Sequence, residues 1–406
     1  MLQGIELEKA QNILLQKVEL LNTTEKLEII KAHERVLAED IYSNINQPPF
    51  NRSPLDGYTF RAEDSKGASR EKPVILNVID EVLAGYCTKK EVIEKTAVRI
   101  MTGAPIPKGA NCVVRQESVD YKEGKVKIFS EFAPWDNVCF KGEDLKNGEL
   151  ILKKGTTLKY GEIGILAIIG IGEIRVYKKP IISVLSTGDE IKDIGQELMP
   201  GQIYNSNLYC ISSRIKECFC KPLMMGSTKD NIKDMCIKIK EAVDKSDIVI
   251  TTGGVSVGKK DIVKDVIKEL GGEILFWKVN IKPGSALLCS ILKGKLIISL
   301  SGNPGAAITA FELIVRPILA KVTGIKELEL RREKGVLSQE FPKKSKTRRF
   351  VRAKITYTEH ENIIKLTQVA QGNGILSSIL NSNCLIDVKA GSEALKKGET
   401  VEVRLL

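Results

Sequence analysis

Glycine and charged residues follow three apolar runs in the second half of the chain, and their types suit the binding of anions and cations. The first group, Ser186 to Glu190, comes directly after the run 181–185 and ends in two adjacent carboxylates. In an open parallel sheet, ligands bind beyond the carboxyl ends of the strands. Ser186 to Glu190 therefore form either a ligand loop of such a sheet or an ordinary turn with a solvated acidic pair.

The second group, Thr251 to Asp261, leads from an apolar run into a predicted helix. Its glycines allow backbone amides to approach an anion at a helix N-terminus. Gly253, Gly258 and Lys259 also reproduce the G-x-x-x-x-G-K spacing of a phosphate-binding P-loop, but Lys260 stands where that motif needs Ser or Thr for magnesium. We interpret this group as an anion cradle, with a P-loop and a glycine turn without function as the alternatives.

The third group, Ser301 to Gly305, joins an apolar run to a predicted helix at 305–321 and suits a second anion cradle. Pro317 should kink this helix near its end. Just upstream, Lys278 and Lys282 flank the strand-like residues "VNI", and residues four apart in one strand point to the same side. These two ammonium groups either bind phosphates or belong to a solvated strand edge.

In the first half of the chain, the segments "PPFNRSPLDGYTFR" (48–61) and "GED" (142–144) place acids in loops, where turn chemistry alone is an alternative explanation. The chain has only two histidines, His33 and His360, which removes most Ser-His-Asp, Cys-His and His-metal schemes. His33 falls in a predicted helix, where we expect a structural role. Catalysis must therefore rely on carboxylates, lysines, backbone amides and bound metal.

The elements that position these groups change in type along the chain. Residues 5–21 and 25–38 are predicted helices, the second begun by Asn22 with Glu25 three residues later. A region rich in short β-branched runs broken by Pro and Gly follows, with a turn at Glu123 and Gly124. Residues 149–178 then suggest a helix and a strand that return to the first segment.

From Lys179 onwards, apolar runs of four to six residues alternate with amphipathic segments, the βαβ pattern of a parallel, doubly wound sheet. Helices are expected at 206–218, 261–270 and 305–321, and strand-like runs return after Gly324. We therefore predict a multidomain α/β protein. Its four domains are a discontinuous linker domain (1–46 and 148–178), a β-rich insertion (47–147), an α/β domain (179–324) and a C-terminal β-domain (325–406).

Composition fits this architecture, because 406 residues exceed the roughly 150 of a typical domain. The net charge of +11 (62 − 51) invites a polyanionic partner, but the excess is spread along the chain. Its densest part, Lys343 to Lys354, holds seven basic residues and resembles a strand. That face is either solvated or in contact with a polyanion.

Nine cysteines without C-x-x-C spacing give no support to a zinc ribbon or a disulfide framework, and they suit reduced thiols in a cytoplasm. Met1 to Gln11 has no apolar signal region. The longest nearly uncharged apolar run, Ile163 to Ile174, is too short to span a membrane. We expect a cytoplasmic protein without a membrane or nucleic-acid partner.

Eight segments, taken together and in order, resemble the MoeA family, the molybdopterin molybdenumtransferases, to which the gephyrin E domain belongs. Each segment alone is a weak signal, but the order of all eight, spanning about residues 5 to 406, is specific. The segments are "PPFNRSPLDGYTFR", "VRIMTGAPIPKGANCVVRQE", "GEDLKNGELILKKGTTL", "VLSTGDEI", "GQIYNSN", "VITTGGVSVGKKD", "FWKVNIKPG" and "GNPGAAITAFELIVRPIL".

The resemblance implies four domains like those predicted, with 179–324 as the molybdopterin-binding domain. It implies a homodimer whose active cleft lies between this domain of one subunit and the β-rich domain of the other. The implied reaction inserts molybdate into adenylylated molybdopterin and releases AMP, assisted by a divalent cation, here Mg²⁺. A molybdopterin adenylyltransferase is then a candidate partner.

The resemblance also implies which residues act. Magnesium binds one or two protein carboxylates besides substrate oxygens and water, so we assign it to Glu190 and Asp261 and leave the other acids to orient water and molybdate. The catalytic positions are Asp56, Thr102, Asp144, Glu190, Asp230 and Asp261. The cofactor-binding positions are Thr252, Gly253, Gly254, Ser256, Gly258, Lys278, Lys282, Gly302 and Asn303.

The chain departs from the family pattern in places that concern substrate phosphates more than the fold. Ser285 stands for the second lysine of "KPGK", Ser301 for the proline of "LPGNP", Ala306 for a serine, and Asn51 for the aspartate of "PPFDNS". In "KSKTRRFVR", Arg348 and Arg349 do not align cleanly with the single arginine of the family pattern. The alternatives left open are a tungstate-preferring paralogue, a molybdopterin-binding paralogue without turnover, an adenylyltransferase and a P-loop NTPase.

Overall fold

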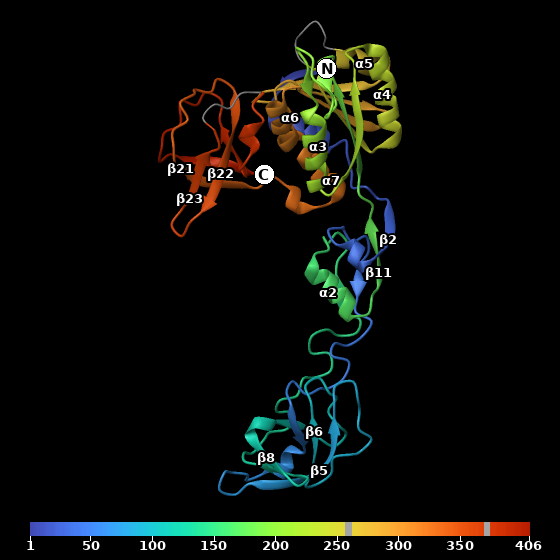
Figure 1. The fold of residues 1–406 in the computed structure, drawn as a ribbon, viewed down its shortest axis with the longest axis vertical. Helices are drawn as coiled ribbons and strands as arrows, with labels where there is room; N and C mark the ends of the chain where they lie inside the picture. The colour runs from blue at the N-terminus through green and yellow to red at the C-terminus, as the bar shows by residue number, and fades with distance from the viewer. Residues whose placement is uncertain (256–261, 369–373) are drawn as a thin grey trace. The chain divides into compact units, whose positions relative to one another are not determined.

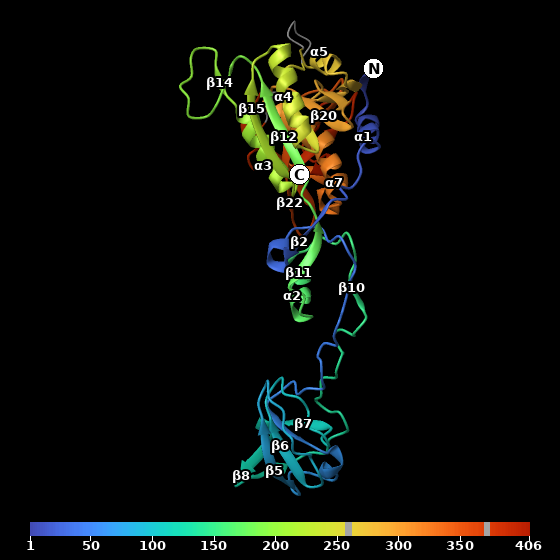
Figure 2. The ribbon, with the colours of Figure 1, turned by 90° about the vertical axis from the view of Figure 1, so that its right-hand side faces the viewer.

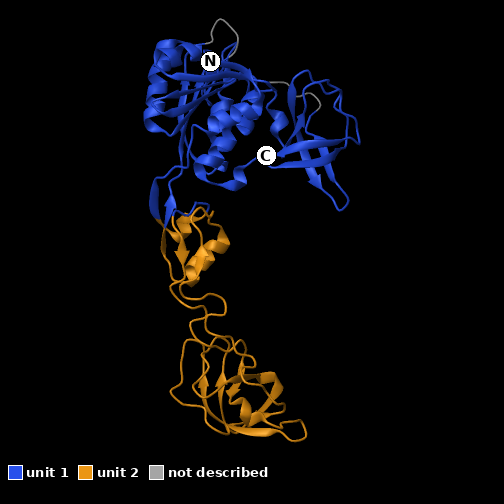
Figure 3. Ribbon diagram, turned by 180° about the vertical axis from the view of Figure 1, so that it is seen from behind, with its two compact units in different colours: residues 1–26, 34–38, 175–406 blue, residues 27–33, 39–174 orange. Residues whose placement is uncertain are grey.

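The computed structural model describes residues 1–255, 262–368 and 374–406. The chain forms two compact units (Figure 3). Unit 1 comprises residues 1–26, 34–38 and 175–406, and unit 2 comprises residues 27–33 and 39–174. The finer division into four domains stays a prediction.

A seven-stranded mixed sheet forms the centre of unit 1. Four neighbouring strands run parallel, and β1 pairs in parallel with β17 at the far edge. The strand order is β1 (Leu2–Ile5), β17 (Glu273–Val279), β19 (Leu288–Leu292), β20 (Lys295–Leu300), β16 (Ile248–Thr252), β12 (Ile181–Thr187) and β15 (Lys221–Thr228).

Helices cover both faces of this sheet, because its strands are apolar on both sides. One face packs against α1 (Leu7–Leu15), α3 (Ser206–Glu217), α6 (Pro304–Ala310) and α7 (Arg316–Thr323). The other face packs against α4 (Ile232–Lys245) and α5 (Ile262–Glu269). Figures 1 and 2 show the sheet between these two layers. The predicted doubly wound α/β domain is confirmed.

The helical stretch that follows β20 is continuous but irregular. A π-helical segment, Phe311–Val315, separates α6 from α7, and Pro317 stands in the first turn of α7. Proline has no N–H to donate within a helix, so irregularity beside it is expected. The predicted helix at 305–321 is confirmed, and its irregular turn lies just before the proline.

The C-terminal strands of unit 1 form a second, six-stranded sheet. Strand β22 pairs with both β23 and β24, so the sheet curls towards a barrel around its own apolar core. The order is β18 (Ile281–Lys282), β22 (Arg348–Tyr357), β23 (Asn362–Leu366), β21 (Arg332–Leu337), β25 (Thr400–Leu405) and β24 (Cys384–Val388).

The basic stretch 343–354 divides into exposed lysines and three arginines of β22 that are partly or fully buried. Arg348 donates two hydrogen bonds of 2.7 Å to Asp387 and two of 2.8 Å to Glu8 of α1. Arg404 donates to the same Asp387 carboxylate at 3.0 Å. Burial opposes ionisation of Asp387, but the hydrogen bonds from Arg348 hold its pKa below the usual value. This ion-pair network, Glu8–Arg348–Asp387–Arg404, ties the second sheet to α1.

Unit 2 is built on a six-stranded sheet with two small apolar cores. Gly57 must be a glycine, since a Cβ there would lie 1.8 Å from the Val114 carbonyl oxygen. Glu123 and Gly124, both at positive φ, make the predicted turn between β8 and β9. The order is β7 (Cys112–Arg115), β4 (Gly57–Phe60), β6 (Thr96–Ile100), β5 (Val74–Val82), β9 (Lys125–Ile128) and β8 (Val119–Lys122).

The N-terminal segment differs from its prediction. Helix α1 ends at Leu15, before the end of the predicted helix 5–21. The predicted helix 25–38 is wrong, because this segment forms strand β2 (Thr24–Glu28) and a short 3₁₀ turn. Asn22 and Glu25 therefore cap no helix, and His33 lies directly after the turn. Strand β2 pairs with β11 (Glu173–Tyr177), a partner that local sequence periodicity does not reveal. The helix and strand predicted at 149–178 are confirmed by α2 (Tyr160–Ile168) and β11.

Shorter strands complete the fold. They are β3 (Ile41–Tyr42) with β10 (Leu150–Leu152), and β13 (Ile191–Lys192) with β14 (Ile203–Tyr204). Across the part of the chain that the structure describes, no helix is long and apolar enough to cross a bilayer.

Candidate active site

The carboxyl ends of the four parallel strands in unit 1 bring three predicted loops together. After β12 the chain adds the next strand, β15, on one side of β12, and then adds β16 on the other side. This reversal is the topological switch point at which open α/β sheets bind ligands. The hydroxyl groups of Thr252 and Ser186, 3.1 Å apart, join β16 to β12 at this point.

The acids of the first loop lie beside an acid that follows β15. The Thr187 hydroxyl donates to Asp230 at 2.7 Å, and the Asp230 N–H donates to Asp189 at 3.2 Å. The Glu190 carboxylate folds over Gly188, where a Cβ would meet it at 2.7 Å. Glu190 and Asp230 therefore lie on neighbouring loops, with Glu190 exposed and Asp230 partly buried.

The two glycine loops are in close contact. The Gly253 N–H donates to the Leu300 carbonyl at 3.1 Å, and a Cβ on Gly302 would lie 3.4 Å from the Gly253 Cα. Gly253 has φ +96°, and a Cβ on it would lie 2.2 Å from the Thr187 carbonyl oxygen. Only glycine permits this approach, which places Thr252, Gly253, Gly254, Gly302 and Asn303 next to the acidic loop.

Some predicted positions of the second loop cannot be placed. Ser256, Gly258 and Asp261 lie outside the residues that the structure describes. Glu190 is therefore the one predicted magnesium ligand whose surroundings are known.

The prediction that Lys278 and Lys282 share one strand is wrong. Strand β17 ends at Val279 and pairs within the central sheet, whereas β18 pairs with β22 in the C-terminal sheet. Lys278 has φ +64°, which breaks the regular alternation of a strand. Lys278 is the second-last residue of β17 in the central sheet, whereas Lys282 lies in β18 of the C-terminal sheet.

Unit 2 holds the second predicted acid cluster. One oxygen of Asp56 accepts hydrogen bonds from the Thr102 N–H at 2.7 Å and the Thr102 hydroxyl at 2.8 Å. These two hydrogen bonds, assisted by nearby Arg99, lower the pKa of Asp56 below its ordinary value. Asp56 is therefore a fixed, ionised carboxylate at neutral pH.

The loop that carries Asp144 is linked to the Asp56 turn through the backbone. Arg52 and Cys139 exchange two backbone hydrogen bonds of 2.9 and 3.0 Å. The Asn51 side chain accepts from the Lys141 N–H at 2.8 Å. Asn51, one of the departures from the family pattern, thus retains a structural role in joining these two loops. Asp144 itself is exposed.

Sequence reasoning missed three side chains at the α/β site. Asn205 caps α3 and accepts from the Ser186 hydroxyl at 2.8 Å, and Asn207 donates to the Gly302 carbonyl at 2.8 Å. Arg352, buried on β22, donates to the Gly305 carbonyl and, at 2.8 Å, to the Thr309 hydroxyl in α6. The signal for Asn205 was its place at the start of a helix; Arg352 was hidden in a basic stretch.

Two buried polar atoms that lack a hydrogen-bond partner also lie at this site. Among the described residues, Asn205 Nδ2 and Asn207 Oδ1 are buried without a hydrogen-bond partner. Buried polar groups are normally paired with protein or with an ordered ligand or water. The site therefore has hydrogen-bonding capacity left for a polar ligand.

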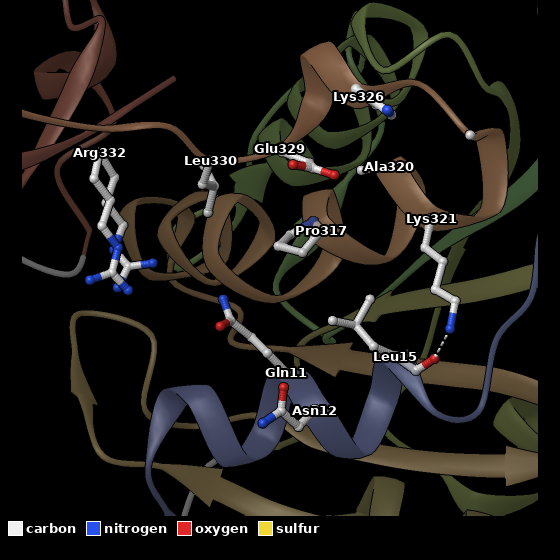
Figure 4. Close-up of a pocket in the computed structure, with 12 residues that line it drawn as sticks. Gln11, Asn12, Leu15, Pro317, Ala320, Lys321, Lys326, Glu329, Leu330 and Arg332 are labelled. Carbon is white, nitrogen blue, oxygen red and sulfur yellow. Dashed lines mark hydrogen bonds between the residues drawn. The ribbon is translucent and has the colours of Figure 1, made fainter. Parts of the chain in front are cut away.

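Another hollow in unit 1, of about 560 Å³, lies between α1 and α7 (Figure 4). Gln11 and Asn12 line its α1 side, and the Lys321 ammonium donates to the Leu15 carbonyl at 2.7 Å beside it. None of the predicted site residues that the structure describes lines this hollow. We give it no part in the chemistry.

Comparisons with known proteins match the same group of proteins along nearly the whole chain. Three family models match: the MoeA N-terminal region (domain I and II) at residues 5–170, a probable molybdopterin binding domain at 183–321 and the MoeA C-terminal region (domain IV) at 334–406. A protein of Staphylococcus aureus (strain COL) named molybdopterin molybdenumtransferase is 37% identical over 401 residues, 98% of this chain and 94% of its own.

Solved structures agree. A crystal structure of a molybdopterin biosynthesis MoeA protein from Pyrococcus horikoshii OT3 is 32% identical with a TM-score of 0.83, and it covers 99% of this chain and 100% of that one. A second structure of a Pyrococcus MoeA protein is 34% identical with a TM-score of 0.85 and 99% coverage of both chains. These matches confirm the multidomain α/β architecture predicted from the sequence.

Proposed function

The chain belongs to the MoeA family of molybdopterin molybdenumtransferases, and from this premise we propose that it inserts molybdate into adenylylated molybdopterin with release of AMP. The observation that carries the proposal is the contact between the Gly253 and Gly302 loops beside Glu190 and Asp230, at the switch point of the sheet. Backbone amides and carboxylates meet there, as a phosphate ester and its cation require.

The reaction brings an oxyanion to a diphosphate ester, so negative charge must be offset where the groups meet. The backbone amides of the two glycine loops are proposed to face phosphate oxygens, since Gly253 and Gly302 add no side chain of their own. Lys278, near the end of β17, and Lys282, in β18, add positive charge. The free hydrogen-bonding atoms of Asn205 and Asn207 suit the polar edge of a pterin.

We propose that Glu190, with Asp261, holds Mg²⁺. The exposed Glu190 carboxylate fits this role, because it leaves room for the water and substrate oxygens that magnesium prefers. Bound Mg²⁺ would neutralise charge on the phosphates as the ester bond breaks. Asp230, fixed by the Thr187 hydroxyl, is then free to orient water or molybdate.

Asp56, Thr102 and Asp144 are proposed to complete the site from a second subunit. The ionised Asp56, held by two hydrogen bonds, suits the orientation of water or of protonated molybdate oxygens. A homodimer is supported by apolar side chains around α2 in unit 2: Tyr160 is 90% exposed, Ile30 72% and Ile168 45%. Exposed apolar patches of this kind typically mark association surfaces.

Light scattering tests the dimer. Wild-type protein should have twice the mass of one chain, and Ile168→Asp should shift it to the monomer and abolish AMP release. The exposed Ile75→Asp, in another part of unit 2, serves as the control and should stay dimeric. A monomeric wild type contradicts the shared cleft.

The proposed setting is the cytoplasm. All nine cysteines are free thiols, which suits a reducing compartment. A molybdopterin adenylyltransferase would supply the adenylylated substrate, because the α/β site described here is proposed to act on that product. Co-elution with such an enzyme during turnover would support the partnership.

The decisive experiment mixes purified protein, adenylylated molybdopterin and magnesium, and follows AMP by chromatography with and without molybdate or tungstate. Release that depends on an oxyanion supports the insertase and identifies the preferred metal. Tight binding of molybdopterin without AMP release contradicts it and favours a binding paralogue. Steady ATP hydrolysis without pterin would favour an NTPase instead.

A further inference from the structure

Two ammonium groups lie close to the ring of Trp277, near the end of strand β17. The Lys278 Nζ is 4.3 Å from the centre of the indole ring, and the Lys264 Nζ, from α5, is 4.9 Å from it. Both distances are within the range of cation–π attraction. Lys264 and Trp277 have no part in the site described so far.

The backbone of Lys278 creates this arrangement. In a regular strand, consecutive side chains point to opposite faces, so residues 277 and 278 would diverge. The φ of +64° at Lys278 breaks that alternation and lets its side chain return over the ring of its neighbour. The Lys278 N–H still donates to the Leu287 carbonyl at 2.8 Å, so the conformation is built into the sheet.

Two features of the arrangement cost free energy when no ligand is bound. A non-glycine residue at positive φ stores strain, and such strain clusters at functional sites. Two like charges around one ring also repel each other. No ion pair joins either ammonium to a carboxylate of the described residues, so the structure offers them no neutralising partner there.

The position of the pair fits the proposed active site. Strand β17 is parallel to β20, since both are antiparallel to β19, and its end therefore lies at the same edge as the glycine loops. Lys264 stands in the first turn of α5, the helix that the second glycine loop leads into. Trp277 packs its inner side against the core beneath α5 and is only partly exposed.

We propose that Trp277 is a positioning residue that presents Lys264 and Lys278 to a phosphate group of the substrate, making Lys264 an additional binding residue. The inference rests on the proposed function, and it names the diphosphate as the part of the substrate bound here. The indole orders the two lysine side chains before binding, which lowers the entropy lost when they contact an anion. On binding, the ammonium groups turn from the ring towards the phosphate oxygens.

Tryptophan fluorescence tests this directly. The chain has two tryptophans, so Trp135→Phe leaves Trp277 as the sole indole. Titration of this variant with inorganic pyrophosphate should give a saturable change in emission, and chloride at equal ionic strength should not. Adding Lys264→Ala should weaken the pyrophosphate affinity by about tenfold, as loss of a charged contact typically does.

Steady-state kinetics separate positioning from folding. Trp277→Leu should raise the KM for adenylylated molybdopterin by about fivefold with kcat within about twofold, because cation–π ordering is worth about 1 kcal/mol. Trp277→Phe keeps an aromatic face and should recover most of the lost affinity. Equal losses in kcat and unfolding temperature, without a change in KM, would show that Trp277 serves only the core and would overturn the inference.

The two proposals fail in different ways. Oxyanion-dependent AMP release with an unchanged KM in Trp277→Leu refutes the positioning role and leaves the insertase intact. Saturable pyrophosphate binding at Trp277 in a protein that never releases AMP supports the anion subsite and refutes the insertase. A flat fluorescence titration overturns the subsite in either case.

Discussion

Replacing Gly253 by alanine tests the contact between the two glycine loops. A Cβ at this position would lie 2.2 Å from the Thr187 carbonyl oxygen, well inside any real contact. Since an ordinary carbon–oxygen contact begins above about 3 Å, strands β12 and β16 must separate locally by about 1 Å. The φ of +96° adds strain of about 1–2 kcal/mol for any residue with a Cβ.

The two effects predict different readouts. A displacement of about 1 Å at a reacting centre lowers rates by about 100-fold, equivalent to about 2.7 kcal/mol of transition-state stabilisation. We therefore expect Gly253→Ala to lower kcat/KM for molybdate-dependent AMP release by about 100-fold. The loss of unfolding free energy should be smaller than in a core truncation, at about 1–3 kcal/mol.

Gly294→Ala is the matched control. Gly294 also has positive φ, at +75°, but nothing lies within 4 Å of its Cβ position, and it is in the β19–β20 turn at the opposite end of β20. This variant should lose similar stability to strain and keep wild-type kcat/KM. If Gly253→Ala retains wild-type kcat/KM while Gly294→Ala is stable, the glycine loops do not bind the substrate as argued.

Three further predictions concern charged groups. Thr102→Val removes one hydrogen-bond donor to Asp56, so the pKa of Asp56 should rise. The acid limb of the kcat/KM profile should then move to higher pH, and AMP release at neutral pH should fall by about tenfold. An unmoved acid limb would contradict this role. Asp387→Asn leaves buried arginines without their shared carboxylate and should destabilise unit 1 by about 3–5 kcal/mol in denaturant unfolding. Burial opposes ionisation of Glu8 and Asp387, but arginine hydrogen bonds lower both pKa values. The stability that these two carboxylates contribute is therefore complete above about pH 5 and is lost as the pH falls through their pKa values in the folded protein. The wild-type unfolding temperature should drop in acid more steeply than that of Asp387→Asn. Lys282→Ala should weaken pyrophosphate binding most at low salt, since screening reduces the contribution of an exposed charge; equal affinity at low salt would remove Lys282 from the site.

The sequence alone predicted what local patterns control. Apolar runs and amphipathic periods marked β12, β16 and β20 and the helices α3, α5 and α6, because each pattern is satisfied within a few residues. The rule that ligands gather at strand ends then pointed to the loops of Glu190, Gly253 and Gly302, whereas Asp230 came only from the family resemblance. The hydrogen bond from Thr187 to Asp230 joins that acid to the first of these loops.

Long-range pairing explains the failures. Residues 24–28 form a strand because β11, about 150 residues later, supplies its partner, and no local period reveals that contact. The spacing of Lys278 and Lys282 predicts one strand face, but positive φ at Lys278 and a change of sheet separate them. A basic run favours solvated charges at Arg348 and Arg352, but Glu8, Asp387 and α6 supply their partners from distant parts of the chain.

The pairing of β1 with β17 constrains how the protein is made. Leu2 lies opposite Phe276, so the first strand meets its neighbour only after some 270 further residues have been synthesised. At ribosomal speeds of about 5–20 residues per second, this delay is roughly 14–55 s. Unit 2 is complete in sequence by residue 174 and can fold during that interval, while α1 and β1 wait with apolar surface uncovered. The apolar side chains of the nascent N-terminal segment therefore stay accessible to chaperones throughout this interval.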